Sequence, residues 1–209
     1  MKAHTKESQA AITPEKGLQL LKAGNLRFQD NVRINRNLIE QVNDTKNGQY
    51  PFASILSCID SRVPAELIFD QGLGDIFNVR VAGNFVNDDI LGSLEFACKL
   101  AGTKLIVVLG HTSCGAIKGA CDNAELGKLT NMLTKIKPAV DAVSTPTDIA
   151  LRKSSNTDFV NQVATKNVHL AVSNIKSQSQ VLSNMHKNGE ILIIGAMYYI
   201  DNGSVVFFQ

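Results

Sequence analysis

A histidine and a cysteine stand three residues apart in this sequence, at His111 and Cys114, directly after the apolar segment KLIVVLG at 104–110. A second cysteine, Cys58, directly follows another apolar segment, FASILS at 52–57. Two thiolates and one imidazole are donors that Zn²⁺ accepts in tetrahedral coordination. Three protein ligands leave the fourth position for water or substrate, as in catalytic zinc sites. The residue types therefore predict a zinc centre with one open position.

Two roles are open to Asp60, which stands two residues after Cys58. Its carboxylate could take the fourth position of the metal and close the site. Arg62 favours the other role, because side chains two residues apart in an extended segment leave the same side of the chain and can form a bidentate pair. A carboxylate held off the metal in this way could accept a proton from zinc-bound water or orient zinc hydroxide.

The segment SCGAIKG, which begins at Ser113, predicts a helix with Cys114 in its first turn. Unpaired backbone N–H groups and the helix dipole favour a thiolate at that position. Gly115 would let the backbone approach a ligand closely. The remaining cysteines, Cys98 and Cys121, lie in apolar surroundings, and we expect them in the core. A thiol redox function is the least favoured, because no C-x-x-C pair is present.

The elements that must position these residues alternate along the chain. Short apolar segments predict buried strands at 52–57, 75–81, 104–110 and 190–200. Helices are expected between them, at about 64–69, 89–101, from 114, and 159–187. This alternation predicts an α/β fold with a mostly parallel central sheet flanked by helices. Ligands bind beyond the carboxyl ends of parallel strands, so the two reactive clusters should meet at one edge of the sheet.

The ends of the chain add a helical arm and an edge strand to this sheet. Thr13 as N-cap and Pro14 at the first helical position predict an N-terminal helix, within a helical arm that spans 1–50. The turn sequence DNG at 201–203 predicts that SVVFFQ pairs antiparallel with the preceding strand, as a C-terminal edge strand. The polar segment 142–158 is expected to be a surface loop, and a length of 209 residues fits a single domain over 1–209.

Composition narrows the class of partner. The chain is 44% apolar and 19% charged with a net charge of +2, which favours neither nucleic acid nor a membrane surface. The longest apolar run, at 191–200, is half of what a spanning helix needs. We expect small-molecule partners or further copies of the chain. The first ten residues lack the apolar segment of a signal peptide, so we expect a cytoplasmic protein, or a periplasmic one if a leader has been removed.

Two motifs resemble those of the β-class carbonic anhydrases: SCIDSRVPAE at 57–66 and LGHTSCGAIKGA at 109–120. The similarity runs from about residue 16 to the C-terminus and includes DIFNVRVAGN at 75–84. It implies one Zn²⁺ per chain on the three ligands named above, with an aspartate–arginine dyad beside it. The implied reaction is the reversible hydration of CO2 to bicarbonate and a proton, with zinc hydroxide as nucleophile. The resemblance also implies a homodimer, often paired into a tetramer, with the active site at the dimer interface and N-terminal helices wrapping the neighbour.

The resemblance further implies a set of substrate-binding residues. Gln49 is expected to reach the site of the partner chain and orient the substrate. Phe77 matches an apolar wall residue, and Ala82 belongs to the same substrate-binding set. Phe96 stands where the plant-like pattern often has tyrosine, which removes one hydroxyl but keeps the apolar wall. The backbone N–H of Gly115 matches a donor to bicarbonate.

Ile55 stands where the bicarbonate-inhibited subtype of this family usually has tryptophan, so the resemblance implies the plant-like, open-site subtype. Two other functions use the same residues. In a structural-zinc interaction protein Asp60 would close the site permanently, and the intact Arg62 argues against it. A zinc lyase or hydrolase acting on CS2 or COS would need the same metal ligands behind a different access route, and the sequence does not separate it from CO2 hydration.

Overall fold

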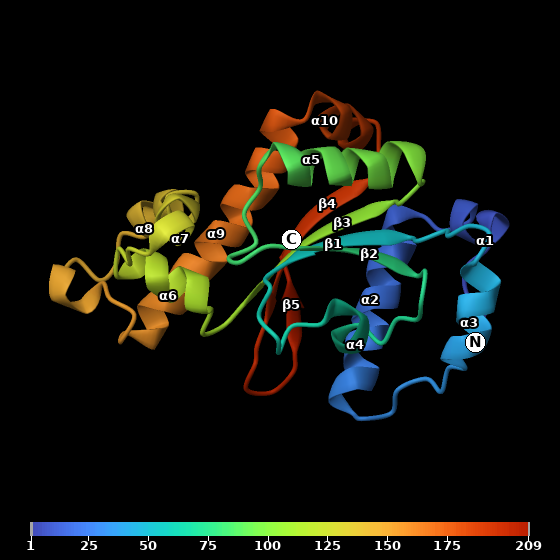
Figure 1. The fold of residues 1–209 in the computed structure, drawn as a ribbon, viewed down its shortest axis with the longest axis horizontal. Coiled ribbons are helices and arrows are strands. Elements are labelled where there is room, and N and C mark those ends of the chain that lie inside the picture. The colour runs from blue at the N-terminus through green and yellow to red at the C-terminus, as the bar shows by residue number, and fades with distance from the viewer. Residues whose placement is uncertain (1, 209) are drawn as a thin grey trace.

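The computed structural model describes residues 2–208 and contains one five-stranded sheet in the order β2-β1-β3-β4-β5 (Figure 1). The strands are β1 Ala53–Ser57, β2 Ile76–Arg80, β3 Leu105–His111, β4 Leu192–Tyr198 and β5 Val205–Phe207. The first four strands pair parallel and β5 pairs antiparallel with β4. The predicted α/β fold, with its mostly parallel sheet and antiparallel C-terminal edge strand, is confirmed.

Helices cover both faces of the sheet (Figure 1). The helices are α1 Lys6–Ala10, α2 Pro14–Gln29, α3 Leu38–Thr45, α4 Ala65–Ile68, α5 Asp88–Glu95, α6 Gly115–Cys121, α7 Gly127–Leu133, α8 Lys137–Ala142, α9 Thr157–Gln178 and α10 Gln180–Lys187. Two short helical turns complete the described chain, the π-helical η1 Phe96–Leu100 and the 3-10 helix η2 Ile149–Leu151. None of the helices in the described range is long and apolar enough to cross a membrane.

The central strand β3 explains why the sequence of a strand in this sheet is apolar at consecutive positions. All seven of its residues are buried, because each face of the sheet packs against helices. Ile106 and Val108 join the apolar cluster formed with α5, α6, α9 and α10, whereas Leu105 and Val107 join the cluster formed with α2 and α4. Successive side chains alternate between the two faces, as a strand requires. The sheet therefore lies between two cores.

The N-terminal helix begins where the sequence predicts. The Thr13 hydroxyl accepts a hydrogen bond from the backbone N–H of Lys16, and Pro14 occupies the first helical position. Leu21 of this helix, α2, is fully buried in the apolar cluster on one face of the sheet. The helix α2 therefore covers that face within the same chain. The following helix α3 exposes Leu38, Ile39 and Val42, a row of apolar side chains on the surface of the described chain.

Three predicted segments differ from the structure. The helix expected over 159–187 is broken at Ser179, whose backbone is extended. The Ser179 hydroxyl accepts a hydrogen bond from Leu182 N–H, which caps α10, and donates one to the Glu95 carboxylate at 2.6 Å. The helix expected over 89–101 changes from α to π geometry at Phe96. The helices α7 and α8 were not predicted separately, and the expected loop 142–158 contains η2. At Ser179 a side-chain hydrogen bond to the backbone decides the break, and apolar periodicity does not report such a bond.

Candidate metal centre

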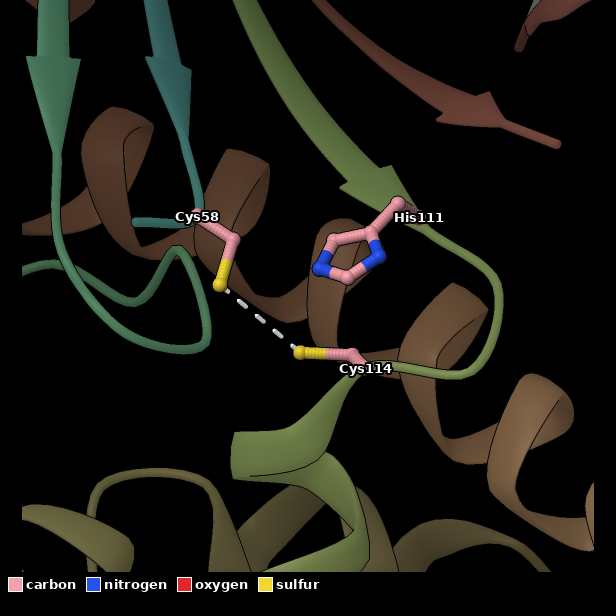
Figure 2. Close-up of side chains that lie close together, drawn as sticks. All are labelled: Cys58, His111 and Cys114. Atoms are coloured by element: carbon pink, nitrogen blue, oxygen red, sulfur yellow. Dashed lines mark hydrogen bonds between the residues drawn. The ribbon is translucent and has the colours of Figure 1, made fainter. Parts of the chain in front are cut away.

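The structure brings the three predicted ligands together at the carboxyl edge of the sheet (Figure 2). Cys58 directly follows β1, His111 is the last residue of β3, and Cys114 follows after a tight turn. The two sulfurs and the imidazole nitrogen lie within 4.8 Å of one another, and all three residues are buried. Because β1 and β3 are paired neighbours in parallel register, their ends must deliver these side chains to the same place.

The imidazole of His111 is oriented toward this centre by its own backbone. Its Nδ1 lies 2.9 Å from the carbonyl oxygen of Thr112, so the ring donates its Nδ1–H there and keeps the Nε2 lone pair free. Nε2 is fully buried and has no hydrogen-bond partner among the described residues. Buried polar atoms are nearly always paired, so a lone pair of this kind, with two thiols beside it, fits a soft divalent cation.

The two thiols form a coupled pair, with their sulfurs 3.8 Å apart. The hydrogen bond with Cys114 lowers the pKa of Cys58 to about 4, whereas the same contact and burial raise the pKa of Cys114. The pair therefore shares one proton, and a metal ion that replaces this proton takes both sulfurs as ligands. The sequence predicted Cys114 in the first turn of α6. In the structure it is instead the N-cap residue, one position before that helix. The backbone amides of Ala116 and Ile117 still lower its pKa, but they do not outweigh the neighbouring sulfur.

Asp60 and Arg62 form the predicted bidentate pair, but in a turn and not in the extended segment that was expected, because Val63 N–H donates to the Asp60 carbonyl at 2.9 Å. Arg62 Nε donates to one carboxylate oxygen at 2.9 Å and Nη2 to the other at 2.8 Å, and the backbone N–H of Arg62 adds a bond at 3.0 Å. These bonds hold the pKa of the Asp60 carboxyl well below its usual range, against the effect of burial. Asp60 Oδ2 lies 3.9 Å from His111 Nε2. The carboxylate thus borders the centre while Arg62 holds both of its oxygens.

Arg80 is a functional residue that the sequence reasoning missed. It is the last residue of β2, and it donates from Nε to the carbonyl of Cys58 at 2.9 Å and from Nη2 to the carbonyl of Asp60 at 2.6 Å. One guanidinium therefore fixes the backbone of a metal ligand and of the neighbouring acid. The available signal was its position, because Arg80 ends a predicted strand at the same sheet edge as Cys58.

The structure separates the five predicted substrate-binding residues into two groups. Gly115 follows Cys114 and is exposed, and a side chain added there would meet open space. Ala82 lies in the loop after β2, next to Gly83, whose N–H donates to Cys58 Sγ at 3.4 Å. These two residues lie beside the metal centre.

The other group lies away from the metal centre of its own chain. The rings of Phe77 and Phe96 are 6.2 Å apart and line a pocket of about 870 Å³ between β2 and α5. Phe77 pairs with Ser54, four residues before Cys58, which is roughly 13 Å along a strand. Gln49 is exposed and precedes β1, at the opposite end of the strand from Cys58.

Comparison of the sequence with known proteins identifies the family of this chain. A family model described as carbonic anhydrase matches residues 53–205, which include the three ligands and the Asp60–Arg62 pair. The chain belongs to the carbonic anhydrase family. Carbonic anhydrase 2 of Mycobacterium tuberculosis is 38% identical over 159 residues, 76% of this chain and 75% of the relative. The carbonic anhydrase of Mycolicibacterium smegmatis is 34% identical over 193 residues, 92% of each chain.

The fold of this carbonic anhydrase is that of solved β-class enzymes. A solved structure of the tetrameric β-carbonic anhydrases of the ascomycete Sordaria macrospora matches it with a TM-score of 0.67 and 22% identity, over 78% of this chain and 83% of that one. The resemblance of the two sequence motifs to β-class enzymes is therefore confirmed. Carbonic anhydrases are lyases that interconvert CO2 and bicarbonate, and the cluster of Cys58, His111 and Cys114 is compatible with their metal site.

Proposed function

We propose that this β-carbonic anhydrase hydrates CO2 at one zinc ion per chain, held by Cys58, His111 and Cys114. The observation that carries the proposal is the buried set of two sulfurs and one unpaired imidazole nitrogen within 4.8 Å. Zinc bound to such a set supplies a Lewis acid that makes water nucleophilic near neutral pH. Three protein donors leave one position for that water.

The residues around the centre have roles in binding and orientation. Asp60 accepts a hydrogen bond from the attacking water and turns its oxygen toward the carbon of CO2, because Arg62 fixes the direction of the carboxylate. As the new C–O bond forms, one C=O electron pair moves onto a CO2 oxygen, and a proton leaves the water for solvent or buffer. The Gly115 N–H donates to the oxygen that becomes negative. The open space at Gly115 supports this role.

A second copy of the chain completes the substrate pocket in this proposal. Gln49, Phe77 and Phe96 lie about a strand length from the metal ligands of their own chain, so they serve the site of a partner. The resulting homodimer is a candidate for further pairing into a tetramer, the state of the Sordaria macrospora enzymes. The substrate is CO2 or bicarbonate, and no nucleic acid or membrane surface takes part.

The open-site subtype is favoured by two observations. The Arg62 guanidinium already binds both oxygens of Asp60, which argues against a permanently closed structural zinc site. Ile55, at the position where the bicarbonate-inhibited subtype usually has tryptophan, is fully buried in β1 and packs in the apolar cluster formed with α2 and α4.

Stopped-flow CO2 hydration at about pH 8.5 tests the proposal, with zinc content measured on the same sample. Turnover should follow zinc occupancy and be lost in Asp60→Asn. Full zinc occupancy without CO2 hydration would overturn the proposal, and turnover of CS2 or COS in the same sample would then identify the other substrate.

A further inference from the structure

The long helix α9 contacts two backbone segments beside the metal centre through two asparagine side chains: the turn between His111 and Cys114, and the loop after β2. Asn161 Oδ1 accepts a hydrogen bond from the backbone N–H of Ser113 at 3.0 Å. Asn167 Nδ2 donates to the backbone carbonyl of Gly83 at 2.7 Å. The helix itself packs against β3, β4 and α6, so it is a rigid part of the core (Figure 1). Neither asparagine touches a metal ligand directly in these bonds.

The contact of Asn167 bears on Cys58 through one residue, Gly83, whose N–H and carbonyl belong to consecutive peptide units. Gly83 accepts from Asn167 with its carbonyl and donates with its N–H to Cys58 Sγ at 3.4 Å. Gly83 has a φ of +82°, and a Cβ at this position would lie 2.4 Å from Ile136 Cδ1, so only glycine fits. Asn167 is 3% exposed. The orientation of the N–H toward the sulfur thus depends on Asn167.

The contact of Asn161 bears on His111 and Cys114 through the turn between them. Ser113 has a φ of +55°, a left-handed conformation that is unfavourable for a residue with a side chain. The turn brings the side chains of His111 and Cys114 close to each other and to Cys58 (Figure 2). The bond from Ser113 N–H to Asn161 is made in this conformation of the turn, so it offsets part of the strain.

We propose that α9 is the support of the metal centre, with Asn161 and Asn167 as positioning residues that hold the Ser113 and Gly83 backbones around the metal ligands. The inference rests on the proposed zinc site. It adds two residues from outside both sequence motifs, one acting on Cys58 and the other on the His111–Cys114 turn.

The two contacts require opposite chemistry from the same residue type, which gives a sharp test. Ser113 N–H can only donate, so position 161 needs an acceptor, and Asn161→Asp keeps one. Gly83 C=O can only accept, so position 167 needs a donor, and Asn167→Asp removes it at a pH where the new carboxyl is ionised. Both variants add the same charge with almost no change in volume. Asn174→Asp, on the same helix, is the control for charge alone.

The experiment measures Zn²⁺ affinity by chelator competition in the wild type and these three variants, with thermal unfolding of each stripped protein as the control for folding. Asn167→Asp should bind Zn²⁺ about tenfold or more weakly, whereas Asn161→Asp and Asn174→Asp should stay close to wild type. Asn161→Leu should weaken binding as Asn167→Asp does. In Co²⁺-loaded protein, Asn167→Asp should also shift the thiolate-to-metal charge-transfer band to longer wavelength, because the sulfur has lost its N–H donor.

Equal affinities for Asn161→Asp and Asn167→Asp would overturn the inference, as would wild-type affinity in Asn161→Leu. A wild type that binds no Zn²⁺ would instead overturn the proposed function. If Asn167→Asp does not fold, position 161 decides the matter through a rescue. Ser113→Gly removes the cost of the left-handed turn, so it should restore affinity to Asn161→Leu, and an absent rescue would count against the inference.

Discussion

The sulfur atoms of Cys58 and Cys114 lie 3.8 Å apart although 56 residues separate them in sequence. Parallel pairing of β1 with β3 produces this distance, because Ser57 lies opposite Leu109 and the chain leaves both strands at the same edge. Two thiolates this close repel each other unless a proton or a cation lies between them. The pair is therefore a site whose charge state depends directly on the metal.

Metal removal should abolish CO2 hydration and leave one thiolate in the centre at neutral pH. The pKa of Cys58 is lowered to about 4 by its hydrogen bond with Cys114, while the pKa of Cys114 is raised. Ultraviolet thiolate absorbance of the chelator-stripped protein should therefore persist at neutral pH and disappear as the pH falls through about 4. Added Zn²⁺ should increase the absorbance and restore activity. Two thiolates, or none, in the stripped protein would contradict this assignment.

Asp60→Asn should lower the rate of CO2 hydration by about 10²-fold or more with zinc retained, since an amide accepts poorly and loses the fork to Arg62. Stopped-flow rates and zinc content on one sample check this. Asp141→Asn is the matched control, because Asp141 forms only a surface ion pair with Lys137. A rate loss of equal size in both variants would show a general effect of charge.

The rate should rise with pH between about 6 and 9, because two thiolates cancel the charge of zinc and make water at the site less acidic than three imidazoles would. Asp60 does not produce this rise. Its pKa is lowered, so its ion pair with Arg62 stabilises the fold above the usual carboxyl pKa and is lost only as the pH falls through the lowered value. That contribution is at most about 1 kcal/mol, since Arg62 is half exposed. A pH–rate profile that falls across this range would contradict the expected donor set.

Arg80→Gln should reduce CO2 hydration about tenfold, because the carbonyls of Cys58 and Asp60 lose a charged donor and the segment between them loosens. Arg80→Lys should retain part of the activity through one of the two bonds. Arg33→Gln, at an exposed position, is the control. Unchanged turnover in Arg80→Gln would show that β1 and β3 position the ligands without it.

The cluster of proposed metal ligands was predictable because its position depends only on strand order and residue type. Apolar runs located β1 and β3, and parallel sheets share a carboxyl edge, so Cys58 and His111 had to meet. The supporting contacts were not predictable in this way. Asn167 reaches Gly83 across 84 residues, and that bond depends on where a loop carbonyl points. No periodicity reports the direction of a loop peptide, and the break at Ser179 was missed for the same reason.

The proposed sharing of substrate residues between two chains can be tested by complementation. Cys58→Ser removes a proposed metal ligand but keeps Gln49, whereas Gln49→Ala removes Gln49 but keeps all three proposed ligands. Each variant alone should therefore be inactive. If Gln49 serves the partner's site, a heterodimer of the two variants contains one intact site, formed by the ligands of one chain and the Gln49 of the other. Purified through two different tags, it should show about half of the wild-type rate per dimer. If Gln49 instead served its own chain, neither site would be intact and the heterodimer would stay inactive. The position of Gln49, before β1 and a strand length from Cys58, favours the first outcome.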